Sequence, residues 1–436
     1  MGLRDYLSRL EKNGKLLKIK KPVSKRLEAA AILKAAEPRP VLFETVKESP
    51  YRIMGNIFCT KDDIASYLNI STRDMIPTLT RGIEHRSLPK EVKTAPCQEV
   101  VEAKVDLDKV PILLHNERDG GPYISAAVVV TTHEEHGQNL DFHRAMPISK
   151  NKMVMRIVEG RHFDTFLKKR GEVDVAFCIG NSAPVLVAAA TSVEIGVNEL
   201  EIANALEPLR VVKAKTSSLL IPADCEWVLE GRVYRDERHD EGPFIDLTET
   251  YDIVRQEPVF EVKCITHRKD AIWQALLPGG FEHKVLMGMP REPTIFRKVT
   301  EAGVKCLDVN VSPGGCSWLH AIVQIDKRQE DDGRTAIAAA FAGHSSCKHV
   351  FVVDKDIDIY NPLEVEWAMA TRFQADTHLV IKPKERGSSL DPSAETGTHL
   401  TTKVGFDLTH PLKVAGGKTF ERAPFPKVDL KTFLEE

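Results

Sequence analysis

The sequence lacks the signals of several large classes of protein. None of its eight cysteines stands in a Cys-x-x-Cys pair, which argues against structural zinc and iron–sulfur sites. No apolar run approaches the roughly 20 residues that cross a bilayer. The N-terminal segment is amphipathic and is interrupted by Arg4, Asp5 and Arg9, so it does not resemble a signal peptide. We therefore expect a cytoplasmic protein that does not contact a membrane.

The chain also lacks a large excess of positive or of negative charge. The 436 residues include 60 Lys and Arg against 63 Asp and Glu, mixed along the chain, for a net charge of −3. Proteins that bind nucleic acid normally present a strongly basic face, so we expect no nucleic-acid partner. A hydrophobic content of 42% with 28% charged residues is typical of a globular protein, and the length predicts more than one domain.

The common nucleotide and hydrolase motifs are absent. There is no Walker loop, no Gly-x-Gly-x-x-Gly after a strand, no His-Glu-x-x-His and no nucleophile elbow. His133-Glu134-Glu135-His136 resembles a metal motif, but it lies in a polar turn, and we interpret it as a solvated surface.

Three regions differ in pattern, and together they predict an α+β multidomain protein. Residues 1–105 alternate helical and extended patterns and predict a small α/β domain. Residues 106–290 are dominated by strand patterns with regularly spaced turn residues, which suggests a barrel. Residues 291–436 return to an α/β pattern, with a tail after about residue 380 that we expect to reach across another domain or subunit. Within the central region, Ile124–Thr132 and Met153–Val158 are expected to pair as a hairpin with a long connection.

Polar residues interrupt the apolar central region in four places. They are Asn139-Leu-Asp-Phe-His-Arg144, Arg161-His162, Glu199 on a short helix, and Glu241-Gly-Pro-Phe-Ile-Asp246. Taken alone, Arg144 is typical of a surface residue and His162 of a structural one. Asn139 and Arg144 differ by five positions and so point to opposite faces of an unbroken strand; they converge only if a turn or bulge intervenes. In the fourth segment, Gly-Pro supplies such a break between Glu241 and Asp246.

These segments belong to an ordered set of motifs that covers nearly the whole chain. The other members are Gly120-Gly121-Pro122-Tyr123-Ile124-Ser125, Glu230-Gly231, Leu277-Pro-Gly-Gly-Phe-Glu-His283, Pro313-Gly-Gly-Cys-Ser-Trp318, Val353-Asp-Lys-Asp-Ile-Asp358, Trp367-Ala-Met-Ala-Thr-Arg372 and Lys403-Val-Gly-Phe-Asp407. In order and spacing, the set resembles the UbiD-type decarboxylases, which bind prenylated flavin mononucleotide (prenylated FMN). The resemblance implies that the central region is a split β-barrel that binds the flavin, and that residues 291–436 have a role in oligomerisation.

The resemblance also implies a metal that bridges the protein to the flavin phosphate. Its ligands would be Asn139, His162 and Glu199, with Glu201 as a nearby rival. An amide oxygen, an imidazole and a carboxylate form a mostly hard ligand set that suits Mn²⁺ or Mg²⁺ better than zinc. The family often binds a monovalent cation such as K⁺ beside the phosphate. Further contacts to the flavin are implied for Ser125, His143, Arg161, Ala189, Ala190, Thr191 and Lys403.

Three further residues are implied to be catalytic. Arg144 would bind a carboxylate through its planar fork, Glu241 would orient Arg144, and Asp246 would deliver or accept the proton that replaces carbon dioxide. Two carboxylates close together in a dry pocket do not both ionise cheaply, so we expect one raised pKa. Some family members have Glu where this chain has Asp246. Loss of carbon dioxide leaves a negative charge on an sp² carbon. Side chains offer no electron sink for this charge, so a cofactor must supply the sink.

The resemblance narrows the substrate to a small carboxylic acid. The chain is most similar to the compact archaeal branch, which favours trans-anhydromevalonate 5-phosphate as substrate and isopentenyl phosphate as product, within an archaeal mevalonate pathway. An aromatic acid of the 4-hydroxybenzoate type is the alternative, and a flavin-binding protein without decarboxylase activity, or an inactive scaffold, is another. Candidates for a phosphate-binding cation are Lys150, Lys152 and Arg161. A flavin prenyltransferase is implied as the cofactor source, and the chain is expected to form a homodimer or higher homo-oligomer.

Overall fold

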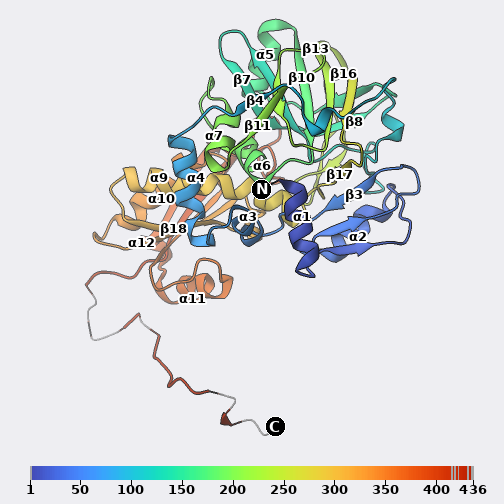
Figure 1. Cartoon of the computed structure of the whole chain (residues 1–436). Coiled ribbons are helices and arrows are strands. Elements are labelled where there is room, and N and C mark those ends of the chain that lie inside the picture. The colour runs from blue at the N-terminus through green and yellow to red at the C-terminus, as the bar shows by residue number, and fades with distance from the viewer. Residues whose placement is uncertain (1, 414–415, 417–418, 421, 430–431, 434–436) are drawn as a thin grey trace.

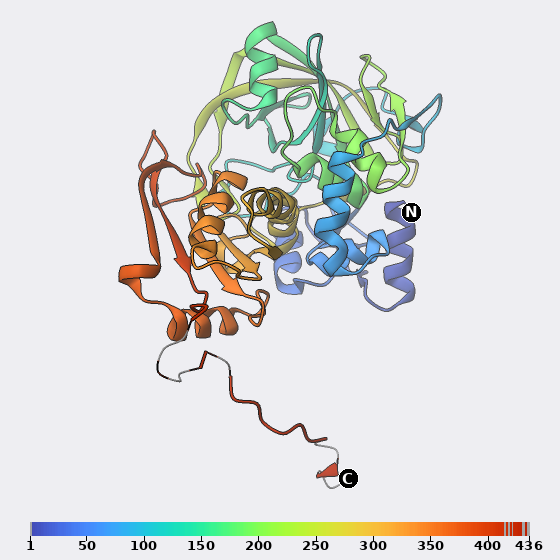
Figure 2. The same cartoon turned by 90° about the vertical axis from the view of Figure 1, so that its left-hand side faces the viewer.

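The described residues form helices and five separate sheets, so the predicted α+β class is confirmed (Figure 1). The computed structural model describes residues 2–413, 416, 419–420, 422–429 and 432–433. In Figure 1 the strands of the central region lie at the top, α1, α2 and β3 lie at the lower right, and the C-terminal region lies at the lower left, with α4 beside α9. Figure 2 shows the same three groups from the side. Within the described residues, no helix combines the length and the apolar composition needed to span a membrane.

The N-terminal region packs helices against a small sheet. Leu3, Tyr6, Leu7 and Leu10 recur at helical spacing and are all buried, which explains why the segment forms an amphipathic helix. The sheet has the order β1-β2-β3-β17, so its last strand comes from much later in the chain. The elements are α1 (Leu3–Lys12), β1 (Leu17–Ile19), α2 (Glu28–Ala36), β2 (Val41–Phe43), β3 (Arg52–Gly55), α3 (Lys61–Leu68), η1 (Thr72–Asp74), α4 (Met75–Glu84) and β17 (Ile272–Gln274).

The central region is built on a large, mainly antiparallel sheet. Its strand order is β7-β6-β10-β13-β16-β9-β8, with β5 paired to β16. Within the described residues, the end strands β7 and β8 do not pair with each other to close a barrel. The elements are β4 (Lys90–Val92), η2 (Pro96–Gln98), β5 (Val100–Val101), η3 (Leu107–Lys109), β6 (Val128–His133), β7 (Gly137–Phe142), β8 (Ala145–Pro147), β9 (Lys152–Met155), α5 (His162–Arg170), β10 (Glu172–Ile179), α6 (Ala183–Ala190), α7 (Glu199–Leu206), β11 (Arg210–Lys213), β12 (Leu220–Pro222), β13 (Trp227–Glu241), β14 (Phe244–Ile245), β15 (Tyr251–Asp252) and β16 (Arg255–His267).

The predicted hairpin between Ile124–Thr132 and Met153–Val158 is wrong. Strand β6 pairs instead with β7, which follows it directly, whereas β9 pairs with β8 and β16. The sequence of β7 did not indicate a strand over a core because Asn139 and Asp141, on one face of it, are polar. Strand β7 ends at Phe142 and β8 begins at Ala145, so the strand is interrupted between Asn139 and Arg144.

The C-terminal region is a three-layer α/β arrangement around a sheet of order β18-β19-β20-β22-β21. Alternate residues of β19 face opposite layers: Ala321 and Val323 pack with α9 and α10, and Ile322 packs with α11. Residues 379–407 are not a tail as predicted, because they supply β21 and β22. The elements are α8 (Phe281–Gly288), η4 (Met289–Arg291), α9 (Glu292–Glu301), β18 (Cys306–Val311), η5 (Pro313–Gly315), β19 (His320–Ile325), α10 (Asp332–Gly343), β20 (His349–Asp354), α11 (Pro362–Arg372), α12 (Ala375–His378), β21 (Leu379–Arg386) and β22 (Leu400–Asp407).

Candidate active site

Arg144 is held by three carboxylates. It lies in the break between β7 and β8, and Glu241 ends β13. Arg144 Nε donates to Glu241 Oε1 at 2.8 Å and Nη2 donates to Glu241 Oε2 at 3.0 Å, which is a bidentate pair. Arg144 Nη1 donates to Asp246 Oδ2 at 2.7 Å. The structure therefore brings together all three residues that the sequence singled out for catalysis.

Asp252, on β15, is a third acidic partner that the sequence did not reveal. Arg144 Nη2 donates to Asp252 Oδ2 at 3.0 Å, and Arg255 pairs with the same oxygen at 2.6 Å. Burial acts to raise the pKa of Asp252, but Arg255 and Arg144 outweigh it and the pKa is lowered. Asp252 is thus ionised at neutral pH. A single aspartate in a short strand carries no motif, so no sequence signal marked it.

Two of the family-like motifs pack together behind this cluster. The Tyr123 hydroxyl donates to Glu241 Oε1 at 3.1 Å and accepts from Gly242 N at 2.8 Å. Gly242 has φ +101°, in the region that favours glycine, so the sharp turn after Glu241 depends on this residue. Gly120 N donates to Pro243 O at 2.8 Å, and a Cβ on Gly120 would collide with the Gly242 carbonyl. The close approach of these backbones sets where Glu241 points.

Asp119 and His283 lie at the margin of the cluster. Burial raises the pKa of Asp119 to about 6, while backbone donors and the nearby Arg144 act in the opposite direction. Burial lowers the pKa of His283, which also experiences the charges of Asp246 and Arg144. Gly279 N donates to His283 Nδ1 at 3.1 Å, so the neutral ring carries its proton on Nε2. The site thus contains a carboxyl group with a raised pKa at a position that the sequence did not indicate.

The three residues predicted as metal ligands come from β7, α5 and α7. His162 Nδ1 lies 2.9 Å from Asn139 Oδ1, a separation that lets both atoms bind one ion when Nδ1 carries no proton. Burial lowers the pKa of His162, which keeps the ring in its neutral, ligating form. Asn139 is buried, and its Nδ2 has no hydrogen-bond partner. A buried polar atom without a partner indicates that a bound group completes this site.

Glu199 supplies a buried carboxyl group next to Asn139. It begins α7, and its Oε2 accepts from Leu140 N at 2.8 Å. Burial raises the pKa of Glu199 to about 8 because, among the described residues, no basic side chain pairs with it. A divalent cation would supply the missing positive charge. The residues present therefore fit a hard metal ion with oxygen and nitrogen ligands. The rival Glu201 lies on the same helix and is less buried.

Asp141 and His143 continue the polar face of β7. Asp141 Oδ1 lies 2.9 Å from His143 Nε2, and the Arg156 carbonyl lies 2.9 Å from His143 Nδ1. Burial acts to lower the pKa of His143, but the Asp141 carboxylate and the Arg156 carbonyl outweigh it, so the pKa is raised. Asp141, which the sequence analysis did not select, also lies close to both residues: its charge adds to burial in raising the pKa of Glu199 and partly opposes the lowering of the pKa of His162.

The remaining predicted flavin contacts are spread over three places. Ser125 Oγ donates to Leu276 O at 2.6 Å. Ala189 and Ala190 end α6, which packs against β7 and α7, and Thr191 caps it with Oγ1 donating to Val187 O at 2.8 Å. Lys403, on β22, is buried and donates to Ser345 O. Helix α6 thus lies next to the elements that carry Asn139 and Glu199, whereas Lys403 lies in the C-terminal region.

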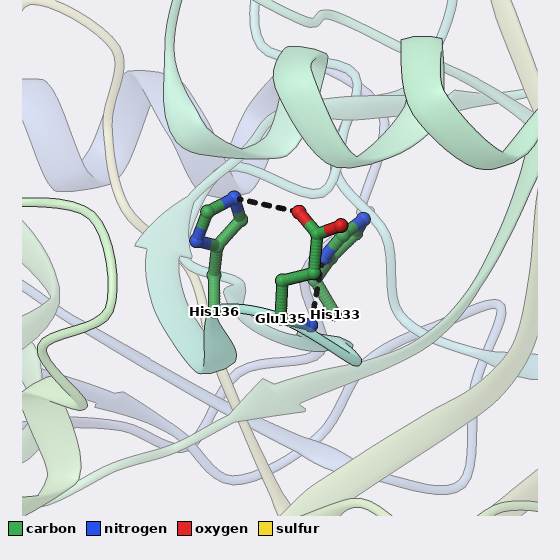
Figure 3. A group of neighbouring side chains, drawn as sticks. All are labelled: His133, Glu135 and His136. Atoms are coloured by element: carbon green, nitrogen blue, oxygen red, sulfur yellow. Dashed lines mark hydrogen bonds and ion pairs between the residues drawn. The ribbon is translucent and has the colours of Figure 1, made fainter.

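The turn 133–136 gathers a second group of ligand-type side chains (Figure 3). Lys169 Nζ donates to Glu135 Oε2 at 2.7 Å and lies 3.2 Å from His136 Nε2. Glu135 N donates to His133 Nδ1 at 3.2 Å, which places the proton of the neutral His133 ring on Nε2. The Lys169 ammonium already supplies the positive charge between Glu135 and His136. The arrangement favours the interpretation as a solvated ion-paired turn.

The chain matches the models of known protein domains over most of its length. Three family models match in order: the N-terminal domain of 3-octaprenyl-4-hydroxybenzoate carboxy-lyase at residues 7–82, its Rift-related domain at 90–281, and its C-terminal domain at 284–408. The chain belongs to the UbiD family. The prediction of a UbiD-type carboxy-lyase, made from the ordered motifs, is therefore confirmed.

Relatives within the UbiD family align with this chain over nearly its whole length. The chain is 42% identical to the anhydromevalonate phosphate decarboxylase of Methanosarcina mazei, over 98% of this chain and 100% of that protein. It is 39% identical to the enzyme of the same name from Methanothermobacter thermautotrophicus, over 96% and 99%. The resemblance to the archaeal branch is confirmed.

Solved structures of UbiD-class enzymes superpose closely. The enzyme HmfF from Pelotomaculum thermopropionicum, in complex with FMN, matches with a TM-score of 0.95 at 34% identity, covering 100% of both chains. The apo 3,4-dihydroxybenzoic acid decarboxylase AroY of Klebsiella pneumoniae matches with a TM-score of 0.91 at 26% identity, covering 99% of this chain and 98% of that one.

Proposed function

We propose that this UbiD family member decarboxylates trans-anhydromevalonate 5-phosphate to isopentenyl phosphate, using prenylated FMN and a divalent metal. The observation that carries the reaction type is the Arg144 cluster, in which one guanidinium faces Glu241, Asp246 and Asp252 within hydrogen-bond distance. The substrate is supported by the relatives named anhydromevalonate phosphate decarboxylase at 42% and 39% identity.

Arg144 would bind the substrate carboxylate through its fork. Glu241 holds Nε and one edge of Nη2, which leaves the Nη1 side as the exchangeable one. A substrate carboxylate that binds there displaces Asp246. The displaced carboxylate then faces a second negative charge, which favours its protonation. When the bond between the substrate carbon and carbon dioxide breaks, Asp246 delivers this proton to the same carbon.

The cofactor would lie between the metal site and Arg144. Prenylated FMN supplies the electron sink that holds the charge left by carbon dioxide. Mn²⁺ or Mg²⁺ on Asn139, His162 and Glu199 would anchor its phosphate, with K⁺ beside it. Further contacts would come from Ser125, His143, Arg161, Ala189, Ala190, Thr191 and Lys403. The large sheet would act as the split barrel that holds the flavin.

Two assembly properties complete the proposal. The chain would take its cofactor from a flavin prenyltransferase and would act as a homodimer or higher homo-oligomer through residues 291–436. Light scattering on purified protein measures the oligomeric state, and a monomer of full activity would contradict this part.

The decisive experiment compares protein produced with and without a flavin prenyltransferase. We expect carbon dioxide release from trans-anhydromevalonate 5-phosphate only with the prenyltransferase, together with bound flavin and metal. Arg144→Ala and Asp246→Ala should lose turnover while keeping the flavin. Activity without flavin or without metal would overturn the proposal. A panel that includes 4-hydroxybenzoates tests the alternative substrate class, and turnover of those acids alone would replace the substrate assigned above.

A further inference from the structure

A second guanidinium–carboxylate pair lies beside the pair of Arg144 and Glu241. Arg156 Nη1 donates to Glu257 Oε1 at 2.6 Å, and the side chains of Arg156 and Glu257 are only 17% and 8% exposed. Arg156 follows β9 directly, and its backbone N donates to the Arg144 carbonyl at 3.1 Å. The two arginines therefore lie opposite each other at the ends of neighbouring strands.

Both arginines point to the same face of the large sheet. Met146 and Val154 are paired in the ladder between β8 and β9, two positions from Arg144 and from Arg156. Side chains two positions apart on a strand share a face. Met146 and Val154 pack in one apolar cluster with Phe244, and Arg144 Cζ lies 5.4 Å from the centre of the Phe244 ring. Like charges at opposed positions repel, so each guanidinium depends on a carboxylate partner of its own.

The Glu257 carboxylate binds the chain where the backbone ladder between β9 and β16 ends. This ladder pairs residues 152–154 with residues 259–261. Pro258, the next residue of β16, has no N–H and so removes one donor from the ladders of this strand. Instead, Glu257 Oε1 accepts from Arg156 Nη1, and Glu257 Oε2 accepts from Ile157 N at 3.4 Å. One side chain thus holds the two residues that follow β9.

The chain at Arg156 is also joined to the strand that carries Asn139. Arg156 O lies 2.9 Å from His143 Nδ1, and His143 Nε2 lies 2.9 Å from Asp141 Oδ1. Asp141 lies on β7, two positions after Asn139, and so points to the same face of that strand. A shift of the Arg156 backbone would therefore displace both the acid-binding arginine and the strand of the proposed metal ligand.

The charge of Glu257 depends on Arg156. Burial raises the pKa of Glu257, and the charge of Glu241 acts in the same direction, while Arg156 and the Ile157 N–H oppose the shift. Without Arg156, this buried carboxylate would face Glu241 with no cation of its own, which is costly. The pair therefore acts as a unit, and removal of either member should release the chain that it holds.

We propose that Arg156 and Glu257 are positioning residues for the decarboxylation. Their ion pair holds the chain opposite Arg144, so that the Arg144 fork stays bidentate on Glu241 and stays aligned with the proposed metal site. Neither residue needs to touch the substrate or the flavin. This inference rests on the proposed function, because that function assigns the substrate carboxylate to Arg144.

The test uses Arg156→Gln, Glu257→Gln and the double variant, in protein produced with a flavin prenyltransferase. We expect kcat for trans-anhydromevalonate 5-phosphate, per bound flavin, to fall roughly tenfold in each single variant, as for a lost charge-assisted hydrogen bond. KM should change little because Arg144 keeps its charge, and flavin content should stay the same. The double variant should lose no more than either single one, because each residue acts through the other. Arg156→Lys keeps the charge and should recover part of the loss.

Arg232→Gln and Asp174→Asn are the matched controls. They break a more exposed ion pair, with Arg232 Nε 2.8 Å from Asp174 Oδ1, between β10 and β13 of the same sheet, and they should match the wild type. A rise of KM with unchanged kcat would overturn the proposal, because it would show that Arg156 binds the substrate directly. Losses that multiply in the double variant, or a lower Tm with full kcat per bound flavin, would also overturn it.

Crystal structures of the variants separate this inference from the function on which it rests. In Arg156→Gln and Glu257→Gln we expect at least one of the two bonds between Arg144 and Glu241, at 2.8 and 3.0 Å in the intact protein, to be broken. An intact fork overturns the positioning role. If the wild type releases no carbon dioxide from the phosphorylated acid or from 4-hydroxybenzoates, the proposed function fails, whereas the structures still decide the positioning role. If Arg156→Gln does not fold, Glu257→Gln and Arg156→Lys carry the same comparisons.

Discussion

Arg144 presents two parallel N–H groups to Glu241, with Nε 2.8 Å from Oε1 and Nη2 3.0 Å from Oε2. This pair fixes the plane of the guanidinium before any substrate binds. Glu241 is fixed in turn by the Tyr123 hydroxyl, and the turn that follows it depends on Gly242. The orientation of the arginine is thus determined by residues that need not touch the substrate.

Replacing Arg144 with lysine should abolish this arrangement while keeping the charge. A point charge cannot form two parallel bonds with Glu241, so we expect kcat/KM to fall roughly a hundredfold, or about 2.7 kcal/mol. Flavin and metal content should stay at the wild-type level. Steady-state carbon dioxide release measures the effect, and Arg238→Lys, at an exposed position on β13, is the matched control. An Arg144→Lys variant with near-normal kcat/KM would show that the fork is not needed.

Asp252→Asn should lower both KM and kcat. Removing this charge leaves one carboxylate fewer to repel the incoming acid, so KM should fall. The guanidinium loses its bond between Nη2 and a charged oxygen, and Arg255 loses its partner, so kcat should also fall, by roughly tenfold. Asp240→Asn, at an exposed position of β13, controls for charge alone. A rise in KM would mean that Asp252 does not compete with the substrate.

Glu199→Gln should lower metal content, whereas Glu201→Gln should not. Glu199 is buried against Leu140 N and has no basic partner among the described residues, so its carboxylate charge is available to a cation. The amide variant keeps the shape and loses the charge. Elemental analysis of purified protein, with bound flavin measured in parallel, compares the two variants. Equal metal content in both would remove Glu199 from the ligand set and return Glu201 to consideration.

The stability of the protein should depend on the ionisation of Glu282. Burial raises the pKa of this carboxyl group on α8 from 4.5 to about 7. The folded state therefore binds the proton more tightly than the unfolded state. Its contribution to stability is fully present below about pH 4.5 and declines as the pH rises through about 7. Glu282→Gln should reduce the loss of stability between about pH 5 and about pH 8.

Denaturant unfolding at the two pH values measures this effect. Glu282 accepts hydrogen bonds from Ile57 N and Gln274 Nε2, so the amide keeps an acceptor at this position. The exposed Glu366→Gln is the control and should leave the pH dependence unchanged. If the free energy of unfolding of Glu282→Gln changes with pH as much as that of the wild type, groups other than Glu282 cause the pH dependence.

Contiguous motifs made part of the site predictable from the sequence. Gly242 and Pro243 predict that the strand ends after Glu241, and β13 does end there. The five-residue spacing of Asn139 and Arg144 required an interruption, and β7 does end before Arg144. In both cases a local rule about strand parity or turn residues was enough, because the two residues are close in sequence.

Contacts between distant segments were not predictable in this way. Strand β7 was missed as the partner of β6 because the face that carries Asn139 and Asp141 is polar where a strand over a core would be apolar. Asp252 and Arg156 carry no motif, and only the fold brings one to Arg144 and the other to Glu257. Functional side chains at isolated positions in the sequence could not be predicted without knowing how the chain packs.

The spacing of Asn139 and Arg144 also limits how this enzyme can evolve. The proposed metal ligand Asn139 and the proposed acid-binding Arg144 share one short stretch of chain, so we expect an insertion or deletion between them to damage both proposed functions in a single event. Changes to the chain, whether natural or engineered, are therefore expected to be tolerated better outside the segment from Asn139 to Arg144 than within it.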